Sequence, residues 1–265
     1  DRPKGRGLGV VSSPVRQAAE KHNIPVFQPD KIKNNEELRA RLGQIAPDAI
    51  VVVGYGRIIP KWMLDLPKYG NINLHASLLP RYRGAAPIQW AVANGEKVTG
   101  VTTMRIDEGL DTGDILLQRD FAIPADYTAE TLAPTLAAIG AELMVETLQG
   151  LQAGTITPQK QNDGEATLAP ILKKEEGRID WARPAVDIYN RLRGFQPWPG
   201  AFTSFRGKSL SVTAARIADR SVEQGRMMVE HECLFAGCGS NTSLELLELQ
   251  PEGRKRISVR DFIHG

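Results

Sequence analysis

Cysteine is scarce in this 265-residue chain, which has only Cys233 and Cys238. Two thiols five positions apart form neither a disulfide framework nor a zinc-binding pattern. No run of 18 apolar residues predicts a membrane span, and no charged-then-apolar leader predicts secretion. The net charge is only +2, which is too small to indicate nucleic-acid binding over the whole surface. We therefore expect a cytoplasmic protein with a substantial hydrophobic core, in which any contact with RNA comes from local basic patches.

Apolar strand patterns alternate with helical ones in the first 153 residues, which predicts an α/β domain. The run "DAIVVVGYG" (48–56) is continuous and β-branched, as is typical of a central parallel strand covered on both faces. The opening "DRPKGRGLG" has no strand and is interpreted as a loop, and the residues after it resemble the middle of an α/β domain, so we expect an N-terminal segment to be absent from this sequence. The other expected strands are 24–29, 71–76, 100–107 and 113–123, and the expected helices are 14–22, 34–46, 85–94 and 128–150.

The pattern changes after Gly154. Residues 154–174 have few helical or strand repeats and are interpreted as a linker, which divides the chain into domains 1–153 and 175–265. The second domain opens with a helix at 184–195 and then becomes period-two, with a hairpin expected to turn at Gly207 and Lys208. Further strands are expected at 226–230, 244–249 and 256–260, so this domain should be rich in β-structure.

The stretch "NINLHASLLPRYRG" (71–84) places Asn73 and His75 two positions apart at the end of an expected buried strand. Side chains two apart in a strand point the same way, and ligands of open α/β sheets gather at the carboxyl ends of strands. An amide and an imidazole suit chemistry at a carbonyl, because both can donate to a tetrahedral oxygen and imidazole also moves protons near neutral pH. A histidine at a strand end is nevertheless more often structural than functional.

A third polar group would be needed to orient the imidazole or to accept protons. The loop "RIDEGLDTGDIL" after the next strand offers Asp107, Asp111 and Asp114. Spacing from the residues alone leaves the choice among these three open, and an acidic loop with glycine is usually only a turn.

Two stretches, "NLHASLLPRYRGAAPIQWAVANGE" and "GVTTMRIDEGLDTGDIL", strongly resemble the formyltransferases that use 10-formyltetrahydrofolate. That family shares Asn-x-His, then Ser-Leu-Leu-Pro, then an aspartate 36 residues after the histidine, and this pattern selects Asp111. The resemblance implies Asn73, His75 and Asp111 as catalytic residues, and it requires no metal. It also implies a Rossmann-like domain with a mostly parallel sheet and a C-terminal OB-like β-barrel.

Three further stretches, "DRPKGRG", "RGAAPIQWA" and "RIDW" with "RGFQPWPGAF", resemble the branch of the family that formylates methionine on initiator tRNA. The expected partners are thus 10-formyltetrahydrofolate and methionyl initiator tRNA, and the expected protein is a monomer. The residues that the resemblance implies for folate binding are Tyr55, Arg57, Ile58, Ile59, Ser77, Leu78, Leu79, Pro80, Asp107 and Gly109. Those expected to contact tRNA are Arg2, Lys4, Arg6, Arg81, Arg83, Lys173, Lys174 and Arg191, and the last domain would bind tRNA.

Other interpretations of the sequence involve enzymes with a similar catalytic domain. A formyltransferase for a sugar amine or another small amine would share Asn73, His75 and Asp111 but usually not the basic opening loop. A glycinamide ribonucleotide transformylase would end near residue 150, and a formyltetrahydrofolate hydrolase would transfer the formyl group to water. A truncated, inactive RNA-binding paralogue is the alternative outside enzymes. The side chains of Ile58 and Ile59 have a second interpretation as core residues.

Overall fold

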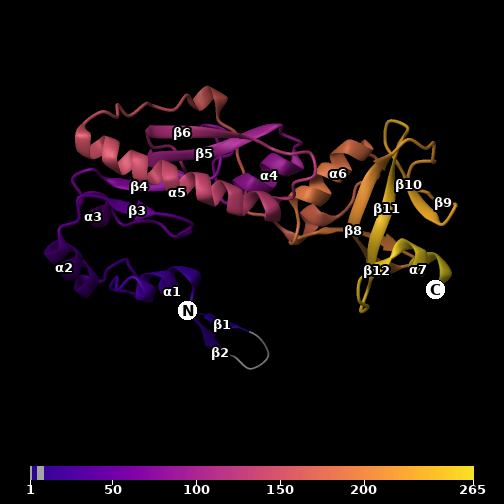
Figure 1. Ribbon diagram of the computed structural model, residues 1–265, viewed down its shortest axis with the longest axis horizontal. Coiled ribbons are helices and arrows are strands. Elements are labelled where there is room, and N and C mark those ends of the chain that lie inside the picture. The colour runs from indigo at the N-terminus through magenta and orange to yellow at the C-terminus, as the bar shows by residue number, and fades with distance from the viewer. Residues whose placement is uncertain (1, 5–8) are drawn as a thin grey trace. The chain divides into compact units, whose positions relative to one another are not determined.

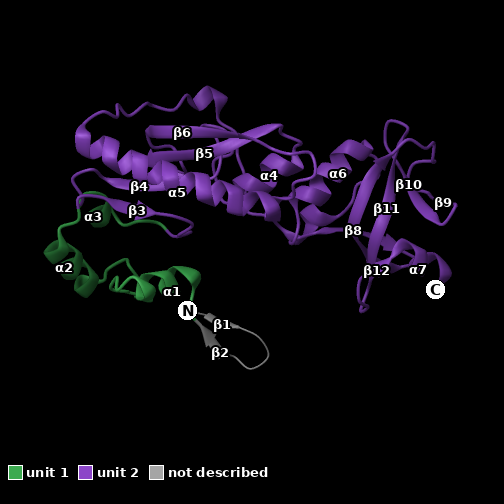
Figure 2. Cartoon of the chain, viewed as in Figure 1, with its two compact units in different colours: residues 1–47, 58–66 green, residues 48–57, 67–265 purple. Residues whose placement is uncertain are grey.

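The computed structural model describes residues 2–4 and 9–265, with side chains from residue 12 onward (Figure 1). The chain divides into two compact units, residues 1–47 with 58–66 and residues 48–57 with 67–265 (Figure 2). In the first unit, β1 (Arg2–Lys4) pairs antiparallel with β2 (Gly9–Val11), so part of the expected opening loop is a hairpin. Three helices follow: α1 (Pro14–Lys21), α2 (Glu36–Ile45) and α3 (Lys61–Leu64). No strand forms at 24–29, where one was expected.

The caps of α1 and α2 explain where these helices begin. Ser13 accepts a hydrogen bond from the backbone N–H of Arg16, and Asn35 accepts one from Leu38. Each side chain satisfies a donor that the first helical turn leaves unpaired.

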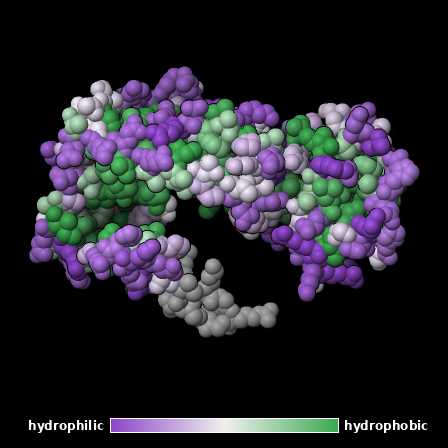
Figure 3. Space-filling model, in the orientation of Figure 1, coloured by the Kyte–Doolittle hydropathy of each residue, from purple (hydrophilic) through white to green (hydrophobic). Residues whose placement is uncertain are grey.

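The second unit contains a four-stranded sheet in the order β3-β4-β5-β6, formed by Ile50–Val52, Asn71–His75, Val98–Arg105 and Ile115–Ala122. The α/β class is confirmed, but the described sheet is mixed rather than mostly parallel. Only β3 and β4 run parallel: β5 is antiparallel to β4, and β6, which follows β5 directly through the loop 106–114, is antiparallel to β5. The expected strand 48–56 is shorter than predicted and lies at the edge of the described sheet, where Val51 is 43% exposed. Figure 3 shows apolar side chains at the surface around β3 and β4.

The long helix α5 (Ala129–Ala153) packs against this sheet. Thr128 caps it through a reciprocal hydrogen-bond pair with Thr131, and its Leu132, Leu136 and Leu143 are buried with Val92 and Val101. Within the described ranges, α5 is the one helix long and apolar enough to cross a membrane by length and composition. Its buried leucines, however, belong to the core of this unit, as does α4 (Pro87–Ala93).

The segment 154–174 was expected to be a linker, and it returns to the sheet along its path. Gln159 and Ile115 exchange two backbone hydrogen bonds, and Thr167 and Ala169 bond the backbone of Arg83 on both sides. The 3₁₀ turn η1 (Asp163–Glu165) interrupts this segment, and a second 3₁₀ turn, η2 (Lys174–Gly177), begins where it ends. The segment therefore lies on the domain it leaves, where it can shape that domain's loops.

The β-rich second domain is confirmed as an antiparallel sheet in the order β7-β8-β11-β10-β9, with β12 on β11. The expected hairpin joins β7 to β8 through Arg206 and Gly207, whose positive φ angles of 50° and 76° suit a two-residue turn. Helix α6 covers a core that includes Leu192, Leu246 and Leu249. The bounds are α6 Ala185–Gly194, β7 Ala201–Phe205, β8 Lys208–Ala218, β9 Met227–Glu230, β10 Cys233–Cys238, β11 Thr242–Pro251, β12 Ile257–Ser258 and α7 Val259–His264.

Candidate active site

Asn73 and His75 lie on β4 and, two positions apart, share one face of it. His75 is only 6% exposed, and its Nε2 lies 2.9 Å from the backbone oxygen of Tyr82. Because that oxygen can only accept, Nε2 carries a proton, and Nδ1 is the ring nitrogen left for other chemistry. The side-chain amide of Asn73 is half-buried and has no hydrogen-bond partner among the described residues. The strand thus presents one unengaged amide and one oriented imidazole.

Asp111 is the aspartate that the structure brings to His75. Its Oδ2 lies 3.7 Å from His75 Nδ1 and accepts a 2.8 Å hydrogen bond from the backbone N–H of Gly84. The first distance is an ion-pair distance and too long for a direct hydrogen bond. Asp107 instead caps its own loop, accepting from the N–H of Gly109 and the hydroxyl of Thr112. Of the three aspartates, Asp111 is the one that contacts His75, and its catalytic role stays a prediction.

The loop after β4 is held by a polar network that no sequence pattern predicted. Thr102 donates to the backbone oxygen of Ser77 at 2.7 Å and accepts from the N–H of Leu79. Gln118 donates to Thr102 and to the backbone oxygen of Leu79. The side chains of Ser77 and Leu79 are fully buried, and the Ser77 hydroxyl bonds the oxygen of Arg81. Both side chains are thus engaged within the protein, and folate contact by Ser77 or Leu79 stays a prediction.

The other predicted folate residues are spread over two units. Tyr55 and Arg57 lie exposed in the second unit after β3, whereas Ile58 and Ile59 lie in the first. The core interpretation of Ile58 is wrong, because this side chain is 92% exposed. The rest of the predicted set comes from the loops around the site: Leu78 and Pro80 are half-buried, and Asp107 and Gly109 are exposed.

Two arginines predicted to contact tRNA are engaged within the protein. Arg83 is 7% exposed, and its guanidinium donates to Gln161 and Asp163 at 2.8 to 3.0 Å. Arg191 donates to the backbone and carboxylate oxygens of Glu176, both at 3.1 Å. The charge of Arg83 is therefore buried and Arg191 is committed to an internal ion pair, and contact of either arginine with tRNA stays a prediction.

The remaining predicted tRNA residues differ in accessibility. Lys173 and Lys174 are exposed, and Arg81 is half-exposed and paired with Glu96. Arg2 and Lys4 lie in β1, and Arg6 lies outside the described residues.

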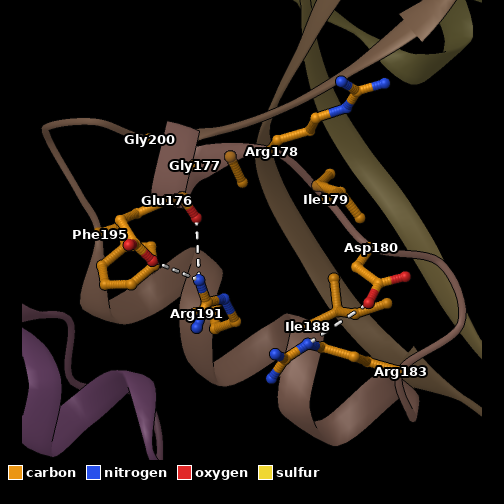
Figure 4. Close-up of a pocket in the computed structure, with 11 residues that line it drawn as sticks. Glu176, Gly177, Arg178, Ile179, Asp180, Arg183, Ile188, Arg191, Phe195 and Gly200 are labelled. Atoms are coloured by element: carbon orange, nitrogen blue, oxygen red, sulfur yellow. Dashed lines mark hydrogen bonds and ion pairs between the residues drawn. The ribbon is translucent and has the colours of Figure 1, made fainter. Parts of the chain in front are cut away.

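A small cavity in the second domain lies beside the Arg191 pair, as Figure 4 shows. It is lined by Glu176, Arg178, Ile179 and Arg191 among others, and its volume is about 10 Å³. That is less than one ordered water needs, so this cavity is a packing gap rather than a ligand site.

Comparison with known proteins identifies the family of this chain. A formyl transferase family model matches residues 1–148, and a formyl transferase C-terminal domain model matches residues 171–265. A methionyl-tRNA formyltransferase of Koribacter versatilis is 64% identical over 265 residues, which cover all of this chain and 85% of that protein.

Solved structures share the fold at lower identity. The sugar 3N-formyl transferase WlaRD, determined with dTDP and 5-N-formyl-THF, superposes with a TM-score of 0.67 at 19% identity, over 91% of this chain and 82% of that one. Methionyl-tRNA formyltransferase from Clostridium thermocellum gives a TM-score of 0.54 at 24% identity, over 87% and 92%.

Proposed function

We propose that this chain, which belongs to the methionyl-tRNA formyltransferase family, transfers a formyl group from 10-formyltetrahydrofolate to methionyl initiator tRNA. One observation carries the catalytic assignment. Asn73 and His75 share a face of β4, and the Asp111 carboxylate lies 3.7 Å from His75 Nδ1. An amide donor, an imidazole and a carboxylate together can stabilise and deprotonate the intermediate of an acyl transfer.

The reaction begins with attack of the neutral α-amino nitrogen of methionine on the formyl carbon. A carbon–nitrogen bond forms, and the carbonyl electrons move to oxygen in a tetrahedral intermediate. The intermediate collapses when the bond between this carbon and N10 of the folate breaks, and N10 then takes a proton. In the net reaction the methionine nitrogen gains the formyl group and loses a proton, and N10 of the folate loses the formyl group and gains a proton.

The developing oxygen anion needs donors in place before the reaction. The amide of Asn73, which has no partner among the described residues, is one such donor. His75 supplies the second through Nδ1 when the ring is protonated, since Nε2 is already committed to the Tyr82 carbonyl. Removing one donor of this kind typically lowers kcat by about 10²–10³-fold.

Asp111 is placed to handle the proton that the attacking amine loses. Its carboxylate is fixed by the N–H of Gly84 at 2.8 Å and faces Nδ1 of His75. It can accept that proton directly or through one water.

The two substrates would occupy different surfaces. We assign the folate to the loops of the second unit that carry Tyr55, Arg57, Leu78, Pro80, Asp107 and Gly109, and contacts with Ile58 and Ile59 stay a separate prediction. We assign the tRNA to Arg81, Lys173 and Lys174 and to the opening segment with Arg2, Lys4 and Arg6. A cytoplasmic monomer is the form we expect to act.

Formyl transfer with three acceptors tests this function. Methionyl initiator tRNA, methionyl elongator tRNA and no acceptor are compared with 10-formyltetrahydrofolate as donor. We expect formylation of the initiator alone. Folate turnover without RNA would refute the proposal and indicate a hydrolase, and formylation of a small amine in preference to tRNA would indicate a transferase for small molecules.

Variants test the catalytic assignment in the same assay. His75→Ala and Asp111→Asn should abolish transfer without unfolding the protein. His22→Ala and Asp120→Asn remove an exposed histidine and an exposed aspartate and should leave the rate unchanged. Near-full turnover by either site variant would show that the assignment is wrong.

A further inference from the structure

Gln161 reaches the Asp111 loop from the segment between the two domains. Its Nε2 donates to the backbone oxygens of Asp111 and Gly113, both at 2.8 Å. Both hydrogens of one amide are therefore used on two carbonyls of a single loop. The loop that carries Asp111 is pinned by a side chain 50 positions further along the chain.

Arg83 fixes which way this amide points. Gln161 Oε1 accepts from Arg83 Nε at 3.0 Å and from Arg83 Nη2 at 2.8 Å. An arginine offers only donors and a carbonyl only accepts, so the amide oxygen must face Arg83 and the amide nitrogen must face the loop. Arg83 is itself buried and held by Asp163, so the orientation is imposed by a rigid partner.

Asp111 needs such a restraint because its backbone is in the left-handed region, with φ of 53°. A residue with a Cβ rarely adopts this conformation unless its surroundings hold it there. In this conformation the carboxylate reaches both Gly84 N–H and the face of His75. Releasing the Asp111 carbonyl would let the peptide relax and move the carboxylate from His75.

The same segment also fixes the opposite side of His75. Tyr82, whose oxygen binds His75 Nε2, donates its N–H to the hydroxyl of Thr167 at 2.8 Å. The oxygen of Ala169 lies where it leaves no room for a Cβ on Gly84, at 2.6 Å. The segment 161–169 therefore supports both partners of the imidazole, Asp111 through the amide of Gln161 and Tyr82 through the hydroxyl of Thr167.

We propose that Gln161, oriented by Arg83, is a positioning residue that holds the Asp111 carboxylate against His75 for formyl transfer. This inference rests on the function proposed above. Gln161 does not touch the reacting atoms, and its contribution passes through the Asp111 peptide. Loss of its amide hydrogens should lower kcat while leaving both substrate-binding surfaces in place.

Gln161→Glu is the sharpest test, because it changes one atom and keeps the length of the side chain. The carboxylate still pairs with Arg83 but offers no hydrogen to the Asp111 and Gly113 carbonyls. We expect kcat to fall about 10²-fold, as is typical of a misplacement of about 1 Å at a catalytic group, and KM for both substrates to change less than about twofold. Gln159→Glu makes the same charge change at an exposed side chain two positions away and should leave kcat unchanged.

A double mutant separates positioning from general loss of structure. If Gln161 acts through Asp111, then adding Gln161→Glu to Asp111→Asn should cost little beyond Asp111→Asn alone in single-turnover assays. Losses that multiply, or wild-type kcat in Gln161→Glu, would overturn the inference. Should Gln161→Glu lose its cooperative thermal transition, Gln161→Met, which adds no charge, replaces it and must show the same loss of kcat.

The inference and the proposed function fail in different ways. Full activity of Asp111→Asn would refute the catalytic assignment itself. An inactive Asp111→Asn beside a fully active Gln161→Glu would leave that assignment intact and refute only the positioning role.

Discussion

Replacing Arg193 with methionine should destabilise the junction between the two domains. Arg193 lies on α6, is only 7% exposed, and donates to the backbone oxygen of Tyr127 at 2.6 Å and to Asn190 at 2.7 Å. Tyr127 belongs to the loop that leads into α5, so this guanidinium joins the second domain to the first. Burial lowers the pKa of Arg193, which shows that the charge is poorly solvated.

The size of the effect follows from these contacts. Hydrogen bonds to a charged group contribute about 1.5–3 kcal/mol each, and methionine leaves two acceptors without a partner. Removing a desolvated charge offsets part of that loss, particularly since Arg193 Nε has no partner among the described residues. We expect the free energy of unfolding to fall by about 3 kcal/mol, which corresponds to a drop in Tm of roughly 6–12 °C for a unit of this size.

Urea unfolding followed by tryptophan fluorescence measures this change. Trp90 on α4 contacts the ring of Phe195 at 5.3 Å, so its emission reports on the junction between α4 and α6. Arg178→Met removes an exposed arginine of the same domain and should stay within about 0.5 kcal/mol of wild type. An Arg193→Met protein as stable as this control would refute the idea that the guanidinium bridges the domains.

Three other predictions concern the core, the loop beside the site and the RNA surface. Burial raises the pKa of the Cys238 thiol from 9.0 to about 11, so its contribution to stability is complete below pH 9 and is lost as the pH rises to 11. The loss is about 3 kcal/mol, and the pH dependence of the unfolding free energy of Cys238→Ala should be shallower than wild type by this amount; equal slopes would contradict it. Gly84→Ala forces a Cβ to 2.6 Å from the Ala169 oxygen at a φ of +123°, so Tm should fall and kcat should fall with it, and an unchanged kcat would argue against a role for this loop. Lys173→Ala combined with Lys174→Ala should flatten the dependence of log affinity for tRNA on log salt by about one to two, and an unchanged slope would exclude both lysines from phosphate contacts.

The pair at the centre of the site could be predicted from the sequence because it depends only on local geometry. Asn73 and His75 end a short strand, and the alternation of a strand places them on one face. Asp111 could not be chosen from the residues, since Asp107 and Asp114 lie in the same loop, and only the family pattern selected it. The direction of β5 was equally beyond local reasoning, because it depends on how the loop before it returns to the sheet.

Basic residues were the least predictable feature. A sequence does not distinguish an arginine on the surface from one that pairs with a distant partner, and Arg83 binds Gln161 and Asp163 about 80 positions away. The same holds for Arg191, whose partner Glu176 lies in the 3₁₀ turn η2 before α6. Burial of a charge depends on tertiary contacts, which hydrophobic periodicity does not encode.

The segment 154–174 was interpreted as a linker because its side chains follow no helical or strand period. Many of its contacts with the first domain are backbone hydrogen bonds, which produce no such pattern in the sequence. Thr167 and Ala169 bond the main chain of Arg83, and Gln159 bonds that of Ile115. Side chains contribute as well, since the Gln161 amide bonds the Asp111 loop, the Thr167 hydroxyl accepts from Tyr82 and Asp163 pairs with Arg83. Because these loops are held by backbone and side-chain groups of a segment that continues directly into the second domain, displacement of that domain would be transmitted to Asp111 and Tyr82. The catalytic geometry would then depend on the junction at Arg193 as well as on the residues of the site.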